Sequence, residues 1–408
     1  MIAQEDVDPF SFPQGLDFVV RSDDCRSGRM SGFTVFDASH NPDRALVAER
    51  LRSGMQNDEE NRVFGTVLGL AVGDALGAPL EFSDLTYGTS DLSGFQSDAW
   101  GRAEYNRFAL RPGQWTDDTS MALCLADSLL LKGAFDAHDV RLRFLNWWYF
   151  GYCNAFFLDD QRPTKNSVGL GGNIWQSFEE FTRLRTQFTT AGDLKTSGNG
   201  SLMRNAPVAL FFRHDARLAD TISYWQSKTT HQGEEAAECC RLLTRCILDG
   251  IRGDGTARCL EGLADRFTSQ VYSVACLSRS EQESACTDNI GASLEDRNWN
   301  WASSDFRYSP TRAREHPEYI GSYAMDALAM ALHCIWSTSS FADAVLKCAN
   351  LGGDSDTTAA ITGQIAGAIY GASAIPMDWI DAVLRWDAHS DILLRAHKLS
   401  QRQRIEME

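Results

Sequence analysis

The chain of 408 residues lacks features that would point to a nucleic-acid or membrane partner. It has no basic excess, because 38 Lys and Arg stand against 55 Asp and Glu, which gives a formal net charge of −17. Nucleic-acid binders present basic patches to phosphate groups, so this balance argues against such a partner. Asp74 and Gln364 interrupt the longest apolar runs, which fall short of the roughly 20 residues that span a bilayer. We expect neither nucleic acid nor a membrane among the partners.

The eleven cysteines also lack the spacing of a disulfide framework or a zinc site. Their number is odd, they form no CxxC motif, and Cys239-Cys240 is an adjacent pair. Scattered thiols of this kind are typical of proteins in a reducing cytosol. The acidic start, Met1–Asp6, precedes no apolar core and so does not resemble a signal peptide. We therefore expect a cytoplasmic protein.

Composition divides the chain into three parts. Residues 1–60 carry twelve Asp or Glu against six Arg, and they combine two short β-like segments with a helical pattern from Asp43 to about Gln56. We predict an N-terminal extension over 1–60, a main domain over 61–390 and a C-terminal tail over 391–408 that begins as a surface helix. The extension is either an arm packed on the domain or a partly ordered tail, or else it is an arm that reaches a partner protein.

The main domain shows the periodicity of helices almost throughout. The apolar stretch from Val63 to Leu76 contains glycines at positions 65, 69 and 73, and a fourth follows at 77. The same spacing of four recurs in the glycines at 363, 367 and 371. Glycines four residues apart share one helical face, and each costs roughly 1 kcal/mol relative to alanine, so the rows predict close approach of other helices. Further helices are predicted over Met121–Leu131, Val140–Trp148, Glu234–Leu248, Tyr323–Trp336 and Phe341–Ala349.

Two acidic clusters lie near the two ends of this domain, each beside a glycine-lined helix. They are Thr116-Asp117-Asp118-Thr119 and Gly352-Gly353-Asp354-Ser355-Asp356-Thr357. One such cluster alone is usually a helix N-terminus, where Thr or Asp caps free N–H groups. Two clusters of the same composition favour a different interpretation. Carboxylate and hydroxyl oxygens are the ligands that Mg²⁺ prefers. Neighbouring carboxylates also need cations to offset their mutual repulsion. The two clusters together therefore predict a centre of one or two metal ions.

The order of several short motifs resembles the ADP-ribosylglycohydrolase family, and the match covers about residues 61–375. The motifs are Gly69-Leu70-Ala71-Val72-Gly73-Asp74-Ala75-Leu76-Gly77, Thr116-Asp117-Asp118-Thr119, Gly198-Asn199-Gly200-Ser201-Leu202-Met203-Arg204, Thr230-His231, Gly321-Ser322-Tyr323 and Gly352-Gly353-Asp354-Ser355-Asp356-Thr357. The resemblance implies an all-α, compact multi-helix domain. It also implies a cleft that holds a binuclear Mg²⁺ centre, with Mn²⁺ as the alternative ion.

The resemblance assigns a role to individual residues in three groups. The metal ligands would be Thr116, Asp117, Asp118, Asp354, Asp356 and Thr357. The substrate-binding residues would be Gly198, Asn199, Gly200, Ser201, Met203 and His231. The catalytic residues would be Glu81, Asp117, Asp118 and Asp356.

The residues themselves leave some of these roles open. Glu81 would orient or deprotonate a water molecule, or else be a solvated surface glutamate. Gly198-Asn199-Gly200 could present N–H groups to a diphosphate, although such sequences are usually plain turns. His231, at the expected start of a helix, is either near the substrate or structural. Arg204 contacts the substrate or braces the loop, and Asp74 is expected to bond a buried helix end.

The implied activity is hydrolysis of ADP-ribose from protein side chains, with arginine as the family's linkage and serine as an alternative. Such cleavage passes through an oxocarbenium-like state, which a pair of carboxylates could also promote without metal. Family members with an extension resemble immunity proteins that reverse and block an ADP-ribosyltransferase toxin. Acidic residues together with Phe10, Phe12, Phe18, Phe33 and Phe36 would suit the arm to that role. The alternatives are a non-catalytic immunity protein that occludes a toxin, a structural relative similar to some lens crystallins, and an unrelated metal-dependent phosphatase.

Overall fold

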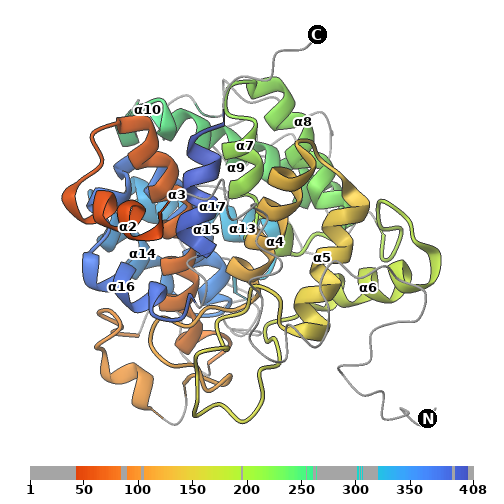
Figure 1. Ribbon diagram of the computed structural model, residues 1–408, viewed down its shortest axis with the longest axis horizontal. Coiled ribbons are helices and arrows are strands. Elements are labelled where there is room, and N and C mark those ends of the chain that lie inside the picture. Colours follow the sequence, from red (N-terminus) through yellow and green to blue (C-terminus); the bar gives the residue numbers. More distant parts are fainter. Residues whose placement is uncertain are drawn as a thin grey trace.

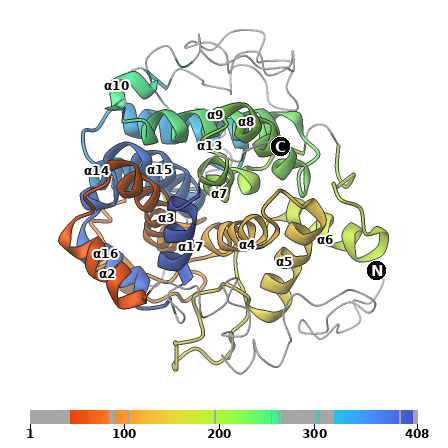
Figure 2. The same cartoon turned by 45° about the horizontal axis from the view of Figure 1, so that its top comes forward.

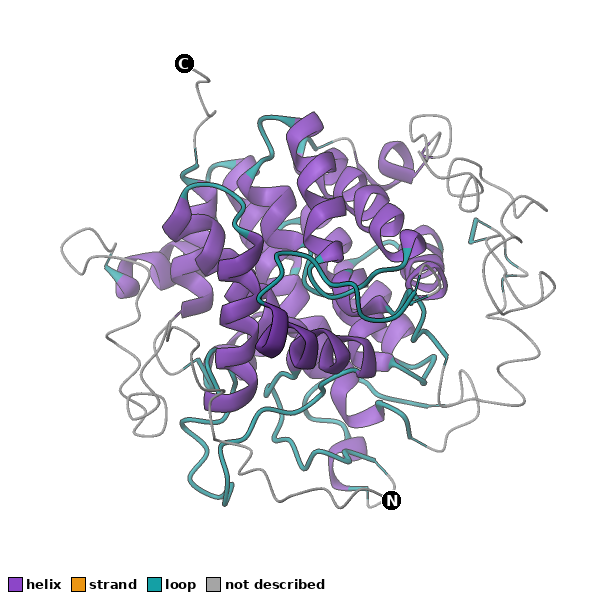
Figure 3. Ribbon diagram, turned by 90° about the vertical axis from the view of Figure 1, so that its right-hand side faces the viewer, coloured by secondary structure: helices purple, strands orange, loops and turns teal. Residues whose placement is uncertain are grey.

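In a computed structural model of the chain, helices α3 (Asp58–Gly77) and α15 (Ser355–Tyr370) pack side by side at the centre of a helical domain (Figures 1 and 2). The structure describes residues 43–83, 90–102, 105–193, 196–253, 255–260, 320–387 and 391–402, together with residues 263, 301, 302, 304 and 306. Over these residues it contains helices joined by loops and no strand, and a single isolated bridge pairs Gly198 with Tyr323 (Figure 3). The predicted all-α class is confirmed.

The glycine row of α3 is in backbone contact with α15. A Cβ atom added to Gly69 would lie 2.3 Å from the carbonyl oxygen of Gly363, and one added to Gly73 would lie 2.2 Å from that of Ala359. The matching contacts run from Gly65 against Gly367 to Gly77 against Ser355, so the two helices are antiparallel. The predicted close approach is confirmed, and the partner of the first glycine row is the second.

The other helices surround this pair. Helices α9 and α13 lie on one side of it and α4 and α5 on another, while α14 and α16 pack near α15 and α3 (Figure 2). Their bounds are α2 Arg44–Ser53, α4 Asp117–Lys132, α5 Ala137–Phe150, α6 Gly172–Leu184, α7 Ala206–Phe211, α8 Ala216–Lys228, α9 Glu234–Ile251, α10 Gly255–Leu260, α13 Ala324–Trp336, α14 Phe341–Ala349, α16 Met377–Leu384 and α17 Asp391–Ser400.

The apolar helix at the centre corrects one expectation from the sequence. By length and composition alone, the helical stretch Asp58–Leu80, of 23 residues, could cross a membrane, because an 18-residue window within it has a mean hydropathy of 1.6. We expected Asp74 to exclude this stretch as a membrane span, and that expectation was wrong. That window is 100% buried inside the protein, and the core helices of soluble proteins have the same length and composition, so these features are weak evidence for a membrane span.

Most predicted helices are present, with corrections at two places. Helix α17 was expected on the surface, but Ile392, Leu394 and Leu399 are buried because the helix packs against α3 and α4. His231 does not open a helix, because α9 starts three residues later with Gly233 as its N-cap. The predicted β-like segments of the extension and most of the polar stretch 278–317 lie outside the described residues, and the three-part division of the chain stays a prediction.

Substitution of Gly73 tests the contact between the two central helices. We expect Gly73→Ala to lower the free energy of unfolding by about 1–3 kcal/mol, because the added methyl group overlaps the backbone of α15 and overpacking costs that much. Gly101→Ala is the control, since a Cβ atom there meets no atom within 4 Å. It should stay within about 0.5 kcal/mol of the wild type in urea unfolding. Equal stability of the two variants would refute the contact.

Candidate metal centre

Asp74 joins the end of α3 to the start of α4. Its Oδ1 accepts hydrogen bonds from the backbone N–H of Thr116 at 3.0 Å and from the Thr116 hydroxyl at 2.9 Å. Its Oδ2 accepts from the backbone N–H of Thr119 at 2.9 Å and from its hydroxyl at 2.6 Å. The carboxylate thereby satisfies two free N–H groups at the start of α4. Its negative charge also interacts favourably with the positive end of the helix dipole. The predicted structural role of Asp74 is confirmed.

The start of α15 is fixed beside the end of α3 and the loop before α13. The Ser355 hydroxyl donates to the carbonyl oxygen of Gly77 at 2.8 Å. The Asp354 backbone N–H donates to Ile320 at 2.7 Å, and Asn199 donates to the Asp354 carboxylate at 3.0 Å. Both acidic clusters are therefore held against the same end of α3, as the two-cluster interpretation requires.

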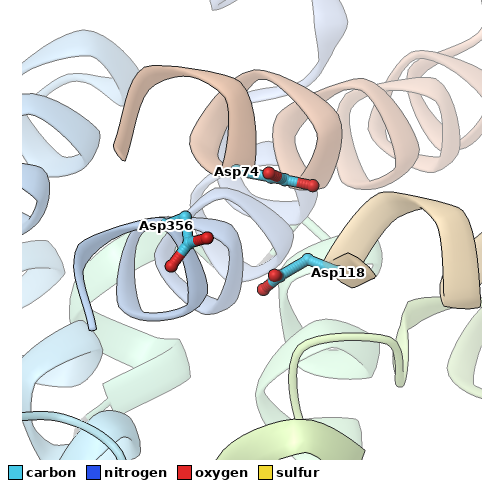
Figure 4. A group of neighbouring side chains, drawn as sticks. All are labelled: Asp74, Asp118 and Asp356. Atoms are coloured by element: carbon cyan, nitrogen blue, oxygen red, sulfur yellow. The ribbon is translucent and has the colours of Figure 1, made fainter. Parts of the chain in front are cut away.

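Two groups of three carboxylates result, and they share one residue. Asp74, Asp118 and Asp356 offer oxygen atoms that all lie within 4.8 Å of one another, as do Glu81, Asp354 and Asp356. Figure 4 shows the first group, in which side chains from α3, α4 and α15 face a common space. All five residues are buried. Asp356 stands where one side chain could contact two ions.

The hydrogen bonds show which of these oxygens are open to a cation. Asp74 is saturated by its four donors, whereas Asp118 Oδ1 and Glu81 Oε2 are buried without any partner. The Thr116 hydroxyl lies 3.1 Å from Asp356 Oδ2 and 3.3 Å from Asp118 Oδ2, but it has only one proton to donate. Buried acceptors without donors are costly, so this donor set fits a hard divalent ion.

Burial and mutual repulsion dominate the electrostatics of the cluster. Burial raises the pKa of Asp117, Asp118, Asp356 and Glu81 well above their usual values, and the neighbouring carboxylates raise them further. A carboxyl whose pKa is raised on folding stabilises the protein below its unfolded pKa, and this stabilisation disappears as the pH rises through the folded pKa. Cations that replace these protons would restore stability at neutral pH.

A cleft with a volume of about 810 Å³ opens onto the acidic centre. Most of the predicted site residues line it, namely Glu81, Asp117, Gly198, Asn199, Gly200, Met203, His231, Asp354 and Thr357. The remaining predicted ligands, Thr116, Asp118 and Asp356, are buried at its base. Ser201 does not line the cleft, because its hydroxyl is fully buried and accepts a hydrogen bond from Ser227 at 2.8 Å. The functional roles assigned to these residues stay predictions.

The structure separates the roles of His231 and Arg204. His231 lines the cleft, and burial first, then the charges of Arg204 and Lys228, lower its pKa to about 3, so it is neutral at physiological pH. Arg204 is buried away from the cleft, where it donates to the Thr230 hydroxyl at 2.6 Å and stacks on Phe144. Of the two roles left open for Arg204, the structure therefore supports bracing of the loop.

Sequence reasoning missed two segments of the cleft wall. The first is the loop 167–173, where Gly169 has a φ of +92° and an added Cβ atom would lie 2.0 Å from Asp117 Oδ1. Its run of glycines at 169, 171 and 172 was a visible signal for close backbone approach. The second comprises Arg107 and Phe108, for which the sequence offers no periodic or compositional signal.

Comparison with known proteins agrees with this geometry. The sequence model of the ADP-ribosylglycohydrolase family matches residues 55–406. An ADP-ribosylarginine hydrolase of Pseudomonas putida is 32% identical over 81% of this chain and 76% of its own length. The ADP-ribosyl-[dinitrogen reductase] glycohydrolase of Rhodospirillum rubrum is 30% identical over 78% of this chain and 89% of its own. A solved structure described as an ADP-ribosylglycohydrolase-related protein complex superposes with a TM-score of 0.61 at 28% identity, covering 84% of this chain and 99% of that one.

Proposed function

The chain belongs to the ADP-ribosylglycohydrolase family, whose members are hydrolases of ADP-ribosylated substrates, and we propose that it removes ADP-ribose from arginine side chains of proteins in a Mg²⁺-dependent reaction. The observation that carries this proposal is the pair of buried carboxylate groups that share Asp356 at the base of the cleft. The names of the relatives from P. putida and R. rubrum support an ADP-ribosylated protein as substrate, and the first of them supports the arginine linkage.

The side chains around Asp356 would divide the work of binding and catalysis. Asp118 and Asp356 would hold one ion, and Asp354 and Asp356 the second, with Glu81 beside it, while Asp74 fixes Thr116 and the start of α4. Bound there, the ions would supply Lewis acidity toward the ribose hydroxyls and a water molecule. Glu81, with one carboxylate oxygen lacking any partner, is placed to orient that water or take its proton.

The rest of the cleft would bind the ADP portion of the substrate. Gly198 and Gly200 border the neutral ring of His231. A Cβ atom added to Gly198 would lie 3.5 Å from Nε2 of this ring, and one added to Gly200 would lie 3.2 Å from its Cε1. The absence of a side chain on these residues lets a diphosphate approach the backbone. Asn199 links this segment to Asp354 and so sets the distance between the diphosphate and the reacting ribose.

The hydrolase proposal is tested by release of ADP-ribose from an arginine-ADP-ribosylated protein, measured with Mg²⁺ and with EDTA. We expect release that requires Mg²⁺ and that falls at least 10³-fold when Asp117 and Asp118 are both replaced by alanine, as for loss of groups that act together in catalysis. Release of inorganic phosphate instead would support the phosphatase alternative. Release that persists in EDTA would support the mechanism with two carboxylates and no metal.

We further propose that the chain acts in the cytoplasm as an immunity protein, with residues 1–60 as the arm that occludes the active site of an ADP-ribosyltransferase toxin. The support is the acidic and phenylalanine-containing sequence of the arm, most of which lies outside the described residues. Five cysteines of the described segments, Cys124, Cys153, Cys240, Cys334 and Cys348, form no disulfide, which fits a reducing compartment. In the non-catalytic alternative, occlusion of the toxin alone protects the cell, and hydrolysis of ADP-ribose is not needed.

Two variants distinguish these roles. A chain without residues 1–42 should lose affinity for the cognate toxin in a binding assay and keep its hydrolase activity, because it retains α2, whose Val47 and Leu51 are buried in the core of the domain. Unchanged affinity would remove the basis for the arm. If cells that express the Asp117→Ala/Asp118→Ala chain stay protected, then occlusion and not hydrolysis accounts for immunity.

A further inference from the structure

The segment 105–110 at the rim of the cleft has an unusual backbone. Asn106 and Ala109, which flank Arg107 and Phe108, have φ values of +58° and +50°. Phe82, on the facing rim next to Glu81, has a φ of +48°. Left-handed conformations are uncommon for residues other than glycine, and they persist where the surroundings impose them, often at functional sites.

Hydrogen bonds hold this segment in place. The Asn106 side chain both accepts from the Leu110 backbone N–H and donates to the Leu110 carbonyl, each at 2.7 Å. The Asn106 backbone N–H donates to Pro79 at 2.6 Å, and Arg162 donates to the carbonyls of Phe108 and Ala109. The two residues between the strained positions are thus presented to the cleft by a fixed support.

Arg107 brings a positive charge to this rim, where it opposes the rise in the pKa of Glu81 that burial and the neighbouring carboxylates cause. Its guanidinium lies 5.2 Å from the ring centroid of Phe82 and 4.7 Å from that of Phe108, so aromatic rings and no described carboxylate form its contacts. Of the described residues that line the cleft, it alone carries a permanent positive charge, since His231 is neutral. Because no carboxylate of the described segments forms an ion pair with it, this exposed guanidinium is available to an anion.

The contacts of Arg107 indicate at which end of the cleft its guanidinium lies. Glu81 and Phe82 separate Arg107 from the carboxylates of Asp354 and Asp356. Asp354 is bonded instead by Asn199, which leads to Gly198, Gly200 and His231 and not to Phe82. If the diphosphate occupies the glycine side and the reacting ribose the acidic centre, as the proposed function requires, then Arg107 faces the protein that carries the ADP-ribose.

We propose that Arg107 recognises a carboxylate side chain next to the modified arginine in the substrate protein. The inference rests on the proposed function and adds the sequence context of the substrate. A guanidinium pairs well with a carboxylate in two parallel hydrogen bonds. Arg107 thereby selects substrates through binding outside the reacting centre, so its effect falls mainly on KM.

Two arginine-ADP-ribosylated peptides that differ only by Glu or Gln beside the modified residue test this inference. We expect the wild type to hydrolyse the Glu peptide with a kcat/KM about 3–5-fold higher, the range for a solvent-exposed ion pair. Arg107→Ala should abolish the preference through KM, and Arg107→Lys should keep part of it. The matched control is Arg102→Ala, because Arg102 contacts Tyr105 and Asp91 and does not line the cleft.

The outcomes separate the inference from the function on which it rests. Equal hydrolysis of both peptides by the wild type overturns the role of Arg107 and leaves the hydrolase proposal intact. If neither peptide is hydrolysed while Mg²⁺ is present, the proposed arginine linkage fails and the inference fails with it. Binding of free ADP-ribose, measured by calorimetry, should be the same for wild type and Arg107→Ala. A tenfold loss there would place Arg107 on the diphosphate instead and overturn the proposal.

Discussion

The backbone contact between α3 and α15 is the constraint on which the rest of the structure depends. Because Gly69 and Gly73 have no side chain, the two helices approach until a carbonyl oxygen occupies the space of each missing Cβ atom. The antiparallel arrangement brings the first turn of α15 to the last turn of α3. Asp74 then fixes the start of α4 at the same place. Three helix ends that are distant in sequence thus surround one small volume.

This arrangement buries more negative charge than the protein itself neutralises. Among the described residues, Arg204 interacts through its charge with Asp117 and Arg107 with Glu81, but neither arginine forms an ion pair with these carboxylates. The unpartnered oxygens of Asp118 and Glu81 are the direct consequence. Divalent cations would satisfy these oxygens, and the same ions would supply the chemistry that hydrolysis needs. Stability and function would then depend on one binding event.

The sequence predicted what depends on periodicity and residue type, and it failed where tertiary packing decides. The glycine rows predicted the close approach of the central helices, and the structure brings the two acidic clusters together at the end of that pair. The buried face of α17 was missed, since its short apolar pattern also fits a surface helix. Arg107 and Phe108 were missed because the conformation around Asn106 comes from bonds to Pro79 and Leu110, which no local pattern encodes.

The central claim is that Asp356 joins two ion sites, and metal stoichiometry tests it most directly. Mn²⁺ binding measured by calorimetry should give two ions for the wild type, one for Asp118→Asn and none for Asp356→Asn. Asp378→Asn, on the exposed face of α16, should still bind two. The account would be contradicted if Asp356→Asn bound as many ions as Asp118→Asn, because the two carboxylate groups would then not share a ligand.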